Sequence, residues 1–580
     1  MFVKKVKTEK SRVYLQIVEG YRNIDGSIKH KVIEKLGYLD DLDKVHDEGG
    51  LVWAKKRADE LTEKYRNSIH SVTLSNPNRI MGENESSERF IGALALNPVY
   101  RKLELPLIMK ALHAKKSKFK GDLNEVLLFL IQSRLFAPES KRSAYTKINQ
   151  FIDNFTFSED QMYYGLEIIG DSWEQIKDAA TNNTDKFYGY NLEIAHYDGS
   201  NFYFEIDKED DFRKKGVSKE GRHDPIVNYG VLSDKNLVPV DIVIYPGNES
   251  EKGYFRTVIE EMKRKHSLKN KIIYVADRGL NCGNNLYTAI ITGNGYILGQ
   301  SLNSEKLEKR ALLQDSYRIT KDSSGDIVFK VKSFVEKDAE ITYTNDDGKK
   351  EKLKMPQKQI VFWSKDYADK QKMEREKLIK KAKNFITSPK SYTRGQIGDA
   401  SAFIKFATFD KNGVYLEGAG SVPQLDLEAI KAKEALDGYF MVVTSELSMP
   451  DDLVLQAYSE QKGQERNFRV DKTYLKIRPV HLSRETRIKA HVLVCFLTHL
   501  IIKIIETKVL KNQIPQEQII QDLKDYRGAL ISSNSYFMFK YTKTAELLAK
   551  INGADARREI QSLSMIKNLF DRYWLYNKLS

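Results

Sequence analysis

Three acidic residues stand at or near the ends of predicted secondary-structure elements, where folding could bring them together. Asp198 ends the predicted strand EIAHYD, Asp277 ends the strand IIYVAD, and Glu465 lies within a helix that opens at Pro450. Carboxylate oxygens are the ligands that hard divalent cations such as Mg²⁺ prefer. Each acid also has a simpler interpretation: Asp198 as part of a tight hairpin turn, Asp277 as a turn or capping residue, and Glu465 as a solvated helix residue. No nucleotide-binding loop, nucleophile elbow or zinc-protease motif occurs in the sequence.

The helix around Glu465 carries an unusual row of side chains. Tyr458, Gln461, Glu465 and Lys472 fall within about 60° of one another at the α-helical repeat, so they share one face. A phenol, an amide, a carboxylate and an ammonium group make a poor core face. They suit a surface where a metal ligand is flanked by groups that hold phosphates. A solvated face with one aromatic residue is the alternative interpretation.

The elements around the first two acids predict a mixed α/β sheet. Strand-like segments occur at 192–197, 202–206, 226–232 and 237–244, followed by an amphipathic helix at 251–266, a strand at 271–276, a short helix and a strand at 295–299. An antiparallel meander that leads into helix, strand, helix and strand is the order of the ribonuclease H fold. A β-rich block interrupts this order, and the α/β pattern resumes at 439–444, just before the helix that carries Glu465.

Changes in periodicity divide the chain into five predicted regions. They are a small basic β domain at 1–50, a helical region at 51–185, a ribonuclease-H-like core at 186–302 and 437–480, a β-rich insertion subdomain at 303–436, and a C-terminal helical region at 481–580. The lysines of the first region could form a surface that grips DNA, or they could simply be solvated. A chain of 580 residues is too long for one hydrophobic core, which supports such a division.

Composition predicts a soluble, intracellular protein with a polyanionic partner. The formal net charge is +14, and the neutralisation of phosphates by Lys and Arg releases condensed counterions. On this ground alone DNA, RNA, an anionic membrane surface and solvated basic faces all stay open. The two cysteines exclude a cysteine zinc site and a disulfide framework. The N-terminus is too charged for a signal peptide, and the apolar run at 491–505 is too short and polar to span a bilayer, so we expect a buried helix there.

Several motifs follow one another along the chain. YDGSNFYFE surrounds Asp198, VADRGLNCGNNL surrounds Asp277, and Tyr458, Glu465 and Lys472 are spaced as Tyr-x6-Glu-x6-Lys. SKEGRHDP, NGYILGQS and RPVHLSRETRIKAHVLVCFL occur as well. Together they resemble the bacterial insertion-sequence DDE transposases, specifically the group named for a Tyr-x2-Arg-x3-Glu-x6-Lys motif. The resemblance runs over about residues 1–505, which is most of the chain.

The resemblance implies a DNA transposase with a ribonuclease-H-like catalytic core. Asp198, Asp277 and Glu465 would hold Mg²⁺ or Mn²⁺, with two ions per site about 3.5–4 Å apart. A water molecule would first nick the end of the element, and the freed 3′-hydroxyl would then attack another phosphodiester. The expected reaction is therefore metal-dependent cleavage and strand transfer at the ends of an insertion sequence.

The resemblance also implies the partners of the chain. Tyr458 and Lys472 would bind phosphates near the scissile end, and Gln461, standing where the group has Arg, would make a weaker neutral contact. The helical region at 51–185 could recognise element ends, although a purely structural bundle would look the same. Double-stranded DNA, as terminal inverted repeats and target DNA, is the expected partner, with a homodimer on paired ends. No membrane partner is expected, and the bacterial cytoplasm, in association with the nucleoid, is the expected location.

Two other functions stay open. Another ribonuclease-H-like nuclease could share the three carboxylates, but it would not be expected to combine the insertion with the Tyr-Glu-Lys row. A DNA-binding relative that has lost catalysis should show broken acidic motifs, whereas all three acids are present here. Short inverted repeats around the gene, with duplicated target sequence outside them, would distinguish a mobile element from both alternatives.

Overall fold

The computed structural model describes residues 1–7, 12–22, 28–66, 86–116, 118–266, 271–313, 316–345, 347–409, 414–416, 422–532 and 535–571. The chain divides into two compact units, Met1–Arg79 and Ile80–Ser580. The second unit contains all the acids that the sequence singled out.

The N-terminal unit is a small antiparallel sheet with two helices. Its elements are β1 (Phe2–Lys7), β2 (Val13–Arg22), β3 (Ile28–Tyr38), α1 (Leu39–Val45) and α2 (Gly50–Arg66). β2 is the central strand and pairs with both neighbours. Leu15, Ile17 and Val18 of β2 are buried, as are Ala54 and Ala58 of α2, which packs on β1 and β2. The β structure predicted for the first region is confirmed for the described residues, and α2 agrees with the helical structure predicted from residue 51.

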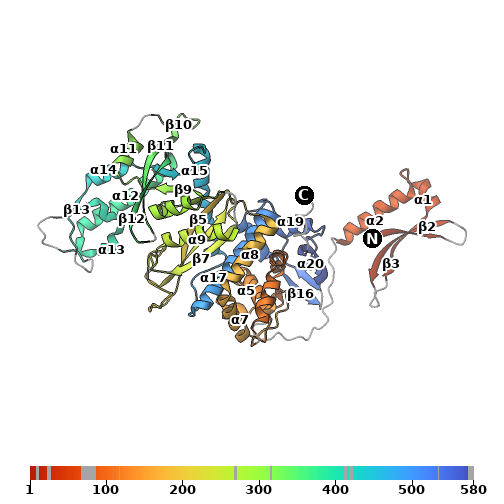
Figure 1. Ribbon diagram of the computed structural model, residues 1–580. Helices are drawn as coiled ribbons and strands as arrows, with labels where there is room; N and C mark the ends of the chain where they lie inside the picture. Colours follow the sequence, from red (N-terminus) through yellow and green to blue (C-terminus); the bar gives the residue numbers. More distant parts are fainter. Residues whose placement is uncertain are drawn as a thin grey trace. The chain divides into compact units, whose positions relative to one another are not determined.

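A nine-stranded mixed sheet lies in the second unit, in the order β10-β11-β12-β15-β9-β8-β5-β6-β7 (Figure 1). Its first half comprises β5 (Ile194–Tyr203), β6 (Ile226–Asp234), β7 (Pro239–Pro246), α9 (Glu251–His266), β8 (Ile273–Ala276), α10 (Gly283–Ile291) and β9 (Gly295–Gln300). β5, β6 and β7 form an antiparallel meander, whereas β5, β8 and β9 run parallel. The connection between β8 and β9 passes through α10, as a parallel crossover requires. The predicted mixed α/β order is confirmed, except that the strands predicted at 192–197 and 202–206 are one strand, β5, and Asp198 lies inside it.

The same sheet continues into the β-rich block that we predicted as an insertion subdomain at 303–436. The block contains α11 (Glu305–Leu312), β10 (Arg318–Lys321), β11 (Ile327–Thr344) and β12 (Lys350–Ser364), and the next sheet strand is β15 (Tyr439–Thr444). β12 pairs with β15, which in turn pairs antiparallel with β9. The physical reason is burial: Ile360 and Val361 of β12 are fully buried beside Val442 and Met441 of β15.

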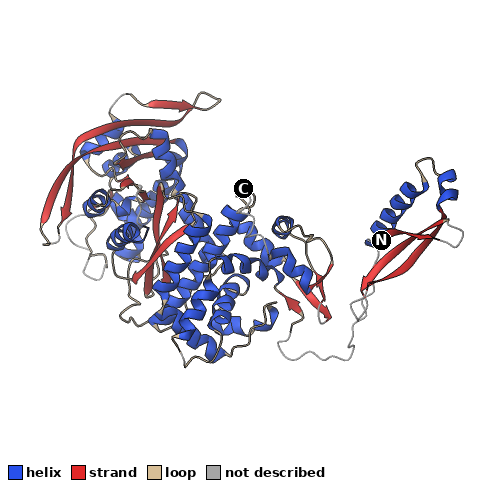
Figure 2. Ribbon diagram, turned by 45° about the vertical axis from the view of Figure 1, so that its right-hand side comes forward, coloured by secondary structure: helices blue, strands red, loops and turns tan. Residues whose placement is uncertain are grey.

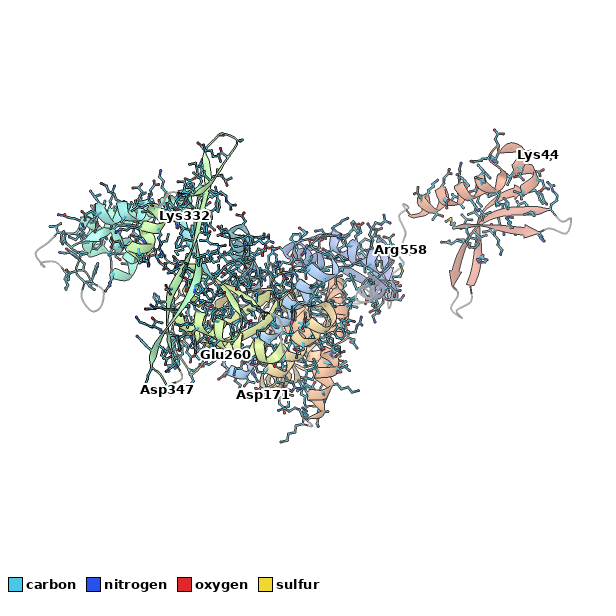
Figure 3. All side chains as sticks on the ribbon, turned by 45° about the horizontal axis from the view of Figure 1, so that its top comes forward. Lys44, Asp171, Glu260, Lys332, Asp347 and Arg558 are labelled. Atoms are coloured by element: carbon cyan, nitrogen blue, oxygen red, sulfur yellow. The ribbon has the colours of Figure 1, made fainter. Side chains whose placement is uncertain are left out.

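The long β11–β12 hairpin curves along one side of the unit, with Lys332 on β11 and Asp347 in the connecting turn (Figures 2 and 3). Its remaining neighbours are α12 (Lys365–Thr387), α13 (Arg394–Ile397), β13 (Ile404–Lys405), β14 (Gln424–Leu425) and α14 (Leu427–Ala435). These elements have a small core of their own, which includes Phe385 and Phe403. This part of the block has a core of its own, and its helix α12 also contacts β11 and β12 of the large sheet.

Two helices follow β15 where we predicted one. α15 (Asp451–Glu460) begins directly after Pro450, as predicted, and α16 (Lys462–Thr473) begins after a break at Gln461. Gly463 lies in the first turn of α16, and a Cβ at this position would overlap the side chain of Leu237. The glycine therefore allows the helix to approach the β6–β7 turn closely, and this contact outweighs the low helix propensity of glycine.

Helices from the two ends of the second unit share one hydrophobic core (Figure 1). The N-terminal set is α3 (Asn97–Lys102), α4 (Leu105–Ala114), α5 (Leu123–Phe136), α6 (Lys141–Tyr145), α7 (Glu159–Asp171) and α8 (Trp173–Tyr188). The C-terminal set is α17 (Glu485–Ile504), α18 (Gln516–Asp525), α19 (Lys543–Ile551) and α20 (Leu563–Phe570). α17 packs against α5, α7 and α8, so the part of the predicted region 51–185 that lies in the second unit shares a core with the region predicted at 481–580, whereas α2 belongs to the N-terminal unit.

The apolar run predicted as a buried helix is confirmed by α17. Among the described helices it alone has the length and hydropathy of a membrane span, yet 94% of its most apolar window is buried inside the protein. Its polar side chains have partners there: Nδ1 of His499 lies 2.6 Å from Oδ1 of Asp471, and Nζ of Lys503 donates to Glu506 at 2.6 Å.

The C-terminal region is not entirely helical, which corrects our prediction for 481–580. β16 (Gly528–Ser532), β17 (Ser535–Met538) and β18 (Ile560–Ser562) form a small sheet with β4 (Glu88–Arg89). These strands are two to five residues long, and such short segments carry too little periodicity to be distinguished from loops or helix ends.

Candidate active site

A cavity of about 610 Å³ is lined by all three predicted acids. Asp198 reaches it from β5, Asp277 from the end of β8, and Glu465 from α16. β5 and β8 are parallel neighbours, and each aspartate lies two residues beyond the last paired residues, His196 and Val275. Adjacent strands thus bring the two aspartates to the same level of the sheet, and α16 adds the glutamate from above one face.

Asp198 occupies an electrostatically crowded position. Its Oδ1 accepts a hydrogen bond from the backbone N–H of Gly199 at 2.8 Å and lies 3.6 Å from Nζ of Lys219. Burial raises the pKa of Asp198 above its ordinary value, and the charges of Asp277 and Glu465 raise it too, while Lys219 and the Gly199 amide oppose the rise. The three acids therefore lie within electrostatic reach of one another.

Asp277 and Glu465 are more open to solvent. Asp277 caps the 3₁₀ turn Arg278–Leu280, because its Oδ1 accepts a hydrogen bond from the backbone N–H of Arg278 at 2.7 Å. Glu465 is an exposed residue in the first turn of α16. The capping role that the sequence left open for Asp277 is real, and it leaves the second carboxylate oxygen available to the cavity.

Two glutamines anchor the α15–α16 break to the sheet. Nε2 of Gln461 donates to the carbonyl of Tyr197 at 2.7 Å, and its Oε1 lies 3.1 Å from Nδ1 of His196. Nε2 of the buried Gln464 donates to the carbonyl of His196 at 3.2 Å. Both side chains hold α16 above β5, which sets the position of Glu465 opposite Asp198. Gln464 was not singled out from the sequence, because nothing in its spacing distinguishes it from other helix glutamines.

Tyr458 also lines the cavity, against β9. Its hydroxyl lies directly over Gly299, where a Cβ would overlap it. Burial raises the pKa of Tyr458 to about 12, and the charge of Asp277 acts in the same direction. The phenol is therefore protonated at neutral pH and can act as a hydrogen-bond donor inside the cavity.

Lys472, the last member of the predicted row, does not line this cavity. Its Nζ lies 3.8 Å from the carboxylate of Glu220, which also forms an ion pair with Arg478. Burial and the charge of Arg478 lower the pKa of Lys472, whereas Glu220 and Asp198 oppose this effect. The row predicted from helix periodicity is therefore divided. Tyr458, Gln461 and Glu465 line the cavity, whereas Lys472 lies outside it, beside Glu220.

A fourth carboxylate, which we did not predict, borders on the site. Glu251 is the first residue of α9, and its carboxylate packs against Gly199, next to Asp198. Burial raises the pKa of Glu251 to about 7, and the charges of Asp198 and Asp277 contribute to the rise. Its Oε1 is buried and accepts no hydrogen bond within the described part of the chain. In the sequence, an acid at a helix start is unremarkable because the helix dipole favours it.

The donor chemistry fits divalent metal ions, although the acids are not gathered around one point. Among the described residues, no three carboxylates, imidazoles or thiolates lie close enough together to hold one ion. The three acids nevertheless face one cavity, and their like charges raise the pKa of Asp198. A bound cation would relieve this repulsion, and a hard ion such as Mg²⁺ keeps several waters among its ligands. Asp198, Asp277 and Glu465 can therefore serve as oxygen ligands together with water.

Comparison with known proteins gives two family matches. The transposase DDE domain matches residues 197–501, which is slightly more than half of the chain, and the N-terminal domain of the IS1634 family transposases matches residues 3–72. No curated protein matches the chain. Among solved structures, a cryo-EM structure of a piggyBac transposase synaptic complex with hairpin DNA is similar at 7% sequence identity, over 79% of this chain and 82% of that chain. Its TM-score of 0.37 is too low to support an argument about fold or function.

Proposed function

Since this chain belongs to the insertion-sequence DDE transposases, a family of DNA-cleaving enzymes, we propose that it cuts and transfers the ends of its element with Asp198, Asp277 and Glu465 as its catalytic carboxylates. The observation that carries this proposal is the convergence of the three acids, from two parallel strands and one helix, on a single cavity. The acids are spread over 268 positions of sequence numbering, from 198 to 465, so their meeting is a property of the fold.

The same three carboxylates would hold Mg²⁺ or Mn²⁺, with two ions per site as in other phosphodiester-cleaving centres. When bound, such ions polarise the phosphate and lower the pKa of a coordinated water. The fold keeps negative charge in a half-buried place, where Lys219, 3.6 Å from Asp198, and the backbone N–H of Gly199 offset it in part. The antiparallel meander followed by parallel strands, with acids at adjacent strands, supports a ribonuclease-H-like core.

The remaining members of the predicted row would act on the DNA in different ways. The protonated hydroxyl of Tyr458 can donate to a phosphate in the cavity, and the ammonium of Lys472 can contact one beside it. Gln461 has both ends of its amide engaged with β5. We therefore assign it a positioning role for α16 in place of the phosphate contact expected from sequence.

The predicted regions of the chain would have different roles around this core. We propose residues 186–302 and 437–480 as the catalytic core, extended by the block at 303–436, with the basic domain at 1–50 and the helical regions at 51–185 and 481–580 available to bind DNA. The partners would be terminal inverted repeats and target DNA, bound by a homodimer on paired ends, in the bacterial cytoplasm at the nucleoid. The net charge of +14 supports a polyanionic partner.

A plasmid assay tests the proposal directly. Purified protein is incubated with a supercoiled plasmid that carries the flanking repeats of the gene, with Mg²⁺ or with EDTA. We expect magnesium-dependent cuts at the repeat boundaries, and loss of these cuts in the Asp277→Asn and Glu465→Gln variants without loss of DNA binding in a gel-shift assay.

The matched control is Asp452→Asn, because Asp452 lines the same cavity but forms an ion pair with Arg318. This variant should cleave like the unmodified protein. Cleavage by Asp277→Asn would remove Asp277 from the mechanism. A clean gel shift without cleavage by the unmodified protein would support the inactive DNA-binding alternative, and cleavage that ignores the repeats would support a general nuclease.

A further inference from the structure

A second, strongly basic cavity lies away from the three acids. Its volume is about 170 Å³, which compares with roughly 30 Å³ for a water molecule in the liquid, so it has room for several waters or one tetrahedral oxyanion. Six of its lining residues carry or can carry a positive charge: Arg134, Lys141, Lys476, Arg478, His481 and His491. They come from α5, α6, α17 and the segment between α16 and α17.

The deepest of these cationic groups have unused donors. Lys141 is 4% exposed and Arg134 is 3% exposed. Within the described residues, Nζ of Lys141 and Nε of Arg134 are buried and make no hydrogen bond. A buried ammonium without a partner is strongly unfavourable. The cavity is therefore built for something that accepts hydrogen bonds and carries negative charge.

The chain itself does not supply that charge. Glu139 is the one acid among the described residues that line the cavity. Its carboxylate is already bound to Nζ of Lys147 at 2.5 Å and to the hydroxyl of Ser143. Burial and the neighbouring Arg134 lower the pKa of Lys141 to about 7, and burial together with Lys141 and Arg134 holds the pKa of His491 well below its usual value. Lowered pKa values of this kind are expected where positively charged groups are buried close together without a negatively charged partner.

A continuous set of contacts links this cavity to the catalytic centre. Arg478, which lines the cavity, forms an ion pair with Glu220, and Glu220 also lies 3.8 Å from Nζ of Lys472. Lys219, the residue before Glu220, lies 3.6 Å from the carboxylate of Asp198. A DNA strand with a phosphate at the catalytic centre would therefore meet a row of basic side chains that leads to the cavity.

We propose that the cavity around Lys141 and Arg134 binds one backbone phosphate of the DNA strand that passes through the catalytic centre. This inference rests on the proposed function, since it takes the acids as the point where the strand is cut. The bound chemistry is a phosphate oxyanion, which accepts hydrogen bonds from the buried ammonium and guanidinium groups. The contact would fix the position of the strand without reading its sequence.

The test compares the protein with its Lys141→Met variant, which keeps the side-chain length and removes the buried charge. Binding of a labelled duplex of the element end is measured over a range of salt concentrations in EDTA, so that no cleavage is required. Loss of one phosphate contact should reduce the salt slope of log K by about 0.9. The control Lys550→Met removes an exposed lysine paired with Glu546 and should leave the slope unchanged.

Inorganic phosphate provides a second measurement, which needs no variant. Millimolar phosphate should raise the thermal unfolding midpoint of the unmodified protein, and the end duplex should remove this added effect by occupying the cavity. An unchanged salt slope in Lys141→Met would overturn the proposal. A phosphate effect that survives saturation with duplex would also overturn it, since the cavity would then take a free anion and no DNA phosphate. A reduced slope in a protein that never cleaves would support the cavity and reject only the proposed catalysis.

Discussion

The carboxylate of Glu251 packs against the backbone of Gly199, so closely that a Cβ on residue 199 would lie 2.6 Å from the carboxyl carbon. Gly199 follows Asp198, whose carboxylate it holds through its own N–H. The hairpin turn considered for Asp198 is therefore not formed. Asp198 and Gly199 both lie inside β5, and Gly199 is paired with Gly230 of β6. Its lack of a side chain allows α9 to begin beside the acids.

Gly199→Ala should therefore destabilise the protein by about 1–3 kcal/mol, because the new methyl group has to displace a buried carboxylate. Urea unfolding checks this value. In a Glu251→Ala background the same substitution should cost less, with a coupling energy of about 0.5–3 kcal/mol. The control is Gly253→Ala, where the nearest atom to the new Cβ is the flexible end of Arg256 at 3.7 Å. Equal costs of Gly199→Ala in both backgrounds would contradict the contact.

Gln461→Leu should lower the free energy of unfolding by about 1–3 kcal/mol, because it leaves the carbonyl of Tyr197 and the ring of His196 without their partner. Cleavage should fall with it, since Glu465 lies on the helix that Gln461 holds. Gln456→Leu is the control: this glutamine lines the same cavity, but it donates to Glu460 in a solvent-exposed hydrogen bond. A Gln461→Leu protein of undiminished stability and weakened DNA binding would restore the phosphate contact that we first expected.

The buried ion pair between α8 and β7 should be strongly stabilising only as a pair. Nζ of Lys177 lies 2.8 Å from Oδ1 of Asp241, and their side chains are 1% and 4% exposed. Lys177→Met should cost about 3–5 kcal/mol in urea unfolding, because it removes the cationic partner of a buried carboxylate. The double variant Lys177→Met/Asp241→Leu should recover part of this loss. By contrast Lys309→Met, which breaks an exposed pair with Glu305, should cost at most about 1 kcal/mol.

Stability should rise with pH between 7 and 9 because of Lys141. Arg134 of α5 and His491 and Cys495 of α17 act on Lys141. Its folded pKa of about 7 lies below the unfolded value of 10.5. In this window the unfolded chain binds more protons than the folded one, so each pH unit adds up to about 1.4 kcal/mol to the free energy of unfolding. Above pH 9 the thiol of Cys495, whose pKa burial raises to about 11, acts in the opposite direction.

Lys141→Met should lose this contribution and show a correspondingly flatter profile between pH 7 and 9. The buried Lys524, with a pKa lowered by burial to about 8, is present in both proteins and cancels in the difference. The measurement is urea unfolding at several pH values in a buffer without phosphate. Identical profiles for the two proteins would show that the ammonium of Lys141 is not desolvated as the structure indicates.

The sequence by itself determined the local elements and the chemical types at their ends. Strand alternation and helix periodicity are properties of neighbouring residues, so β8 and the helix start after Pro450 could be predicted, and with them the places of Asp277 and Glu465. β5 was predicted as two strands, with Asp198 at the end of the first and not inside one continuous strand. The family resemblance also followed from short motifs that are local in sequence. The separation of Tyr458 and Gln461 from Lys472 could not be predicted, because helix periodicity gives a common face and not what that face meets.

Only the tertiary structure decided which distant groups meet. The engagement of Gln461 with β5, the approach of Glu251 to Gly199 and the pairing of Lys472 with Glu220 all join separate elements. The basic cavity combines side chains from residues 134–141 with others from residues 476–491. In each case the decisive quantity is the burial of a charged or polar group. Burial depends on what the rest of the chain packs around the group, which no local pattern records.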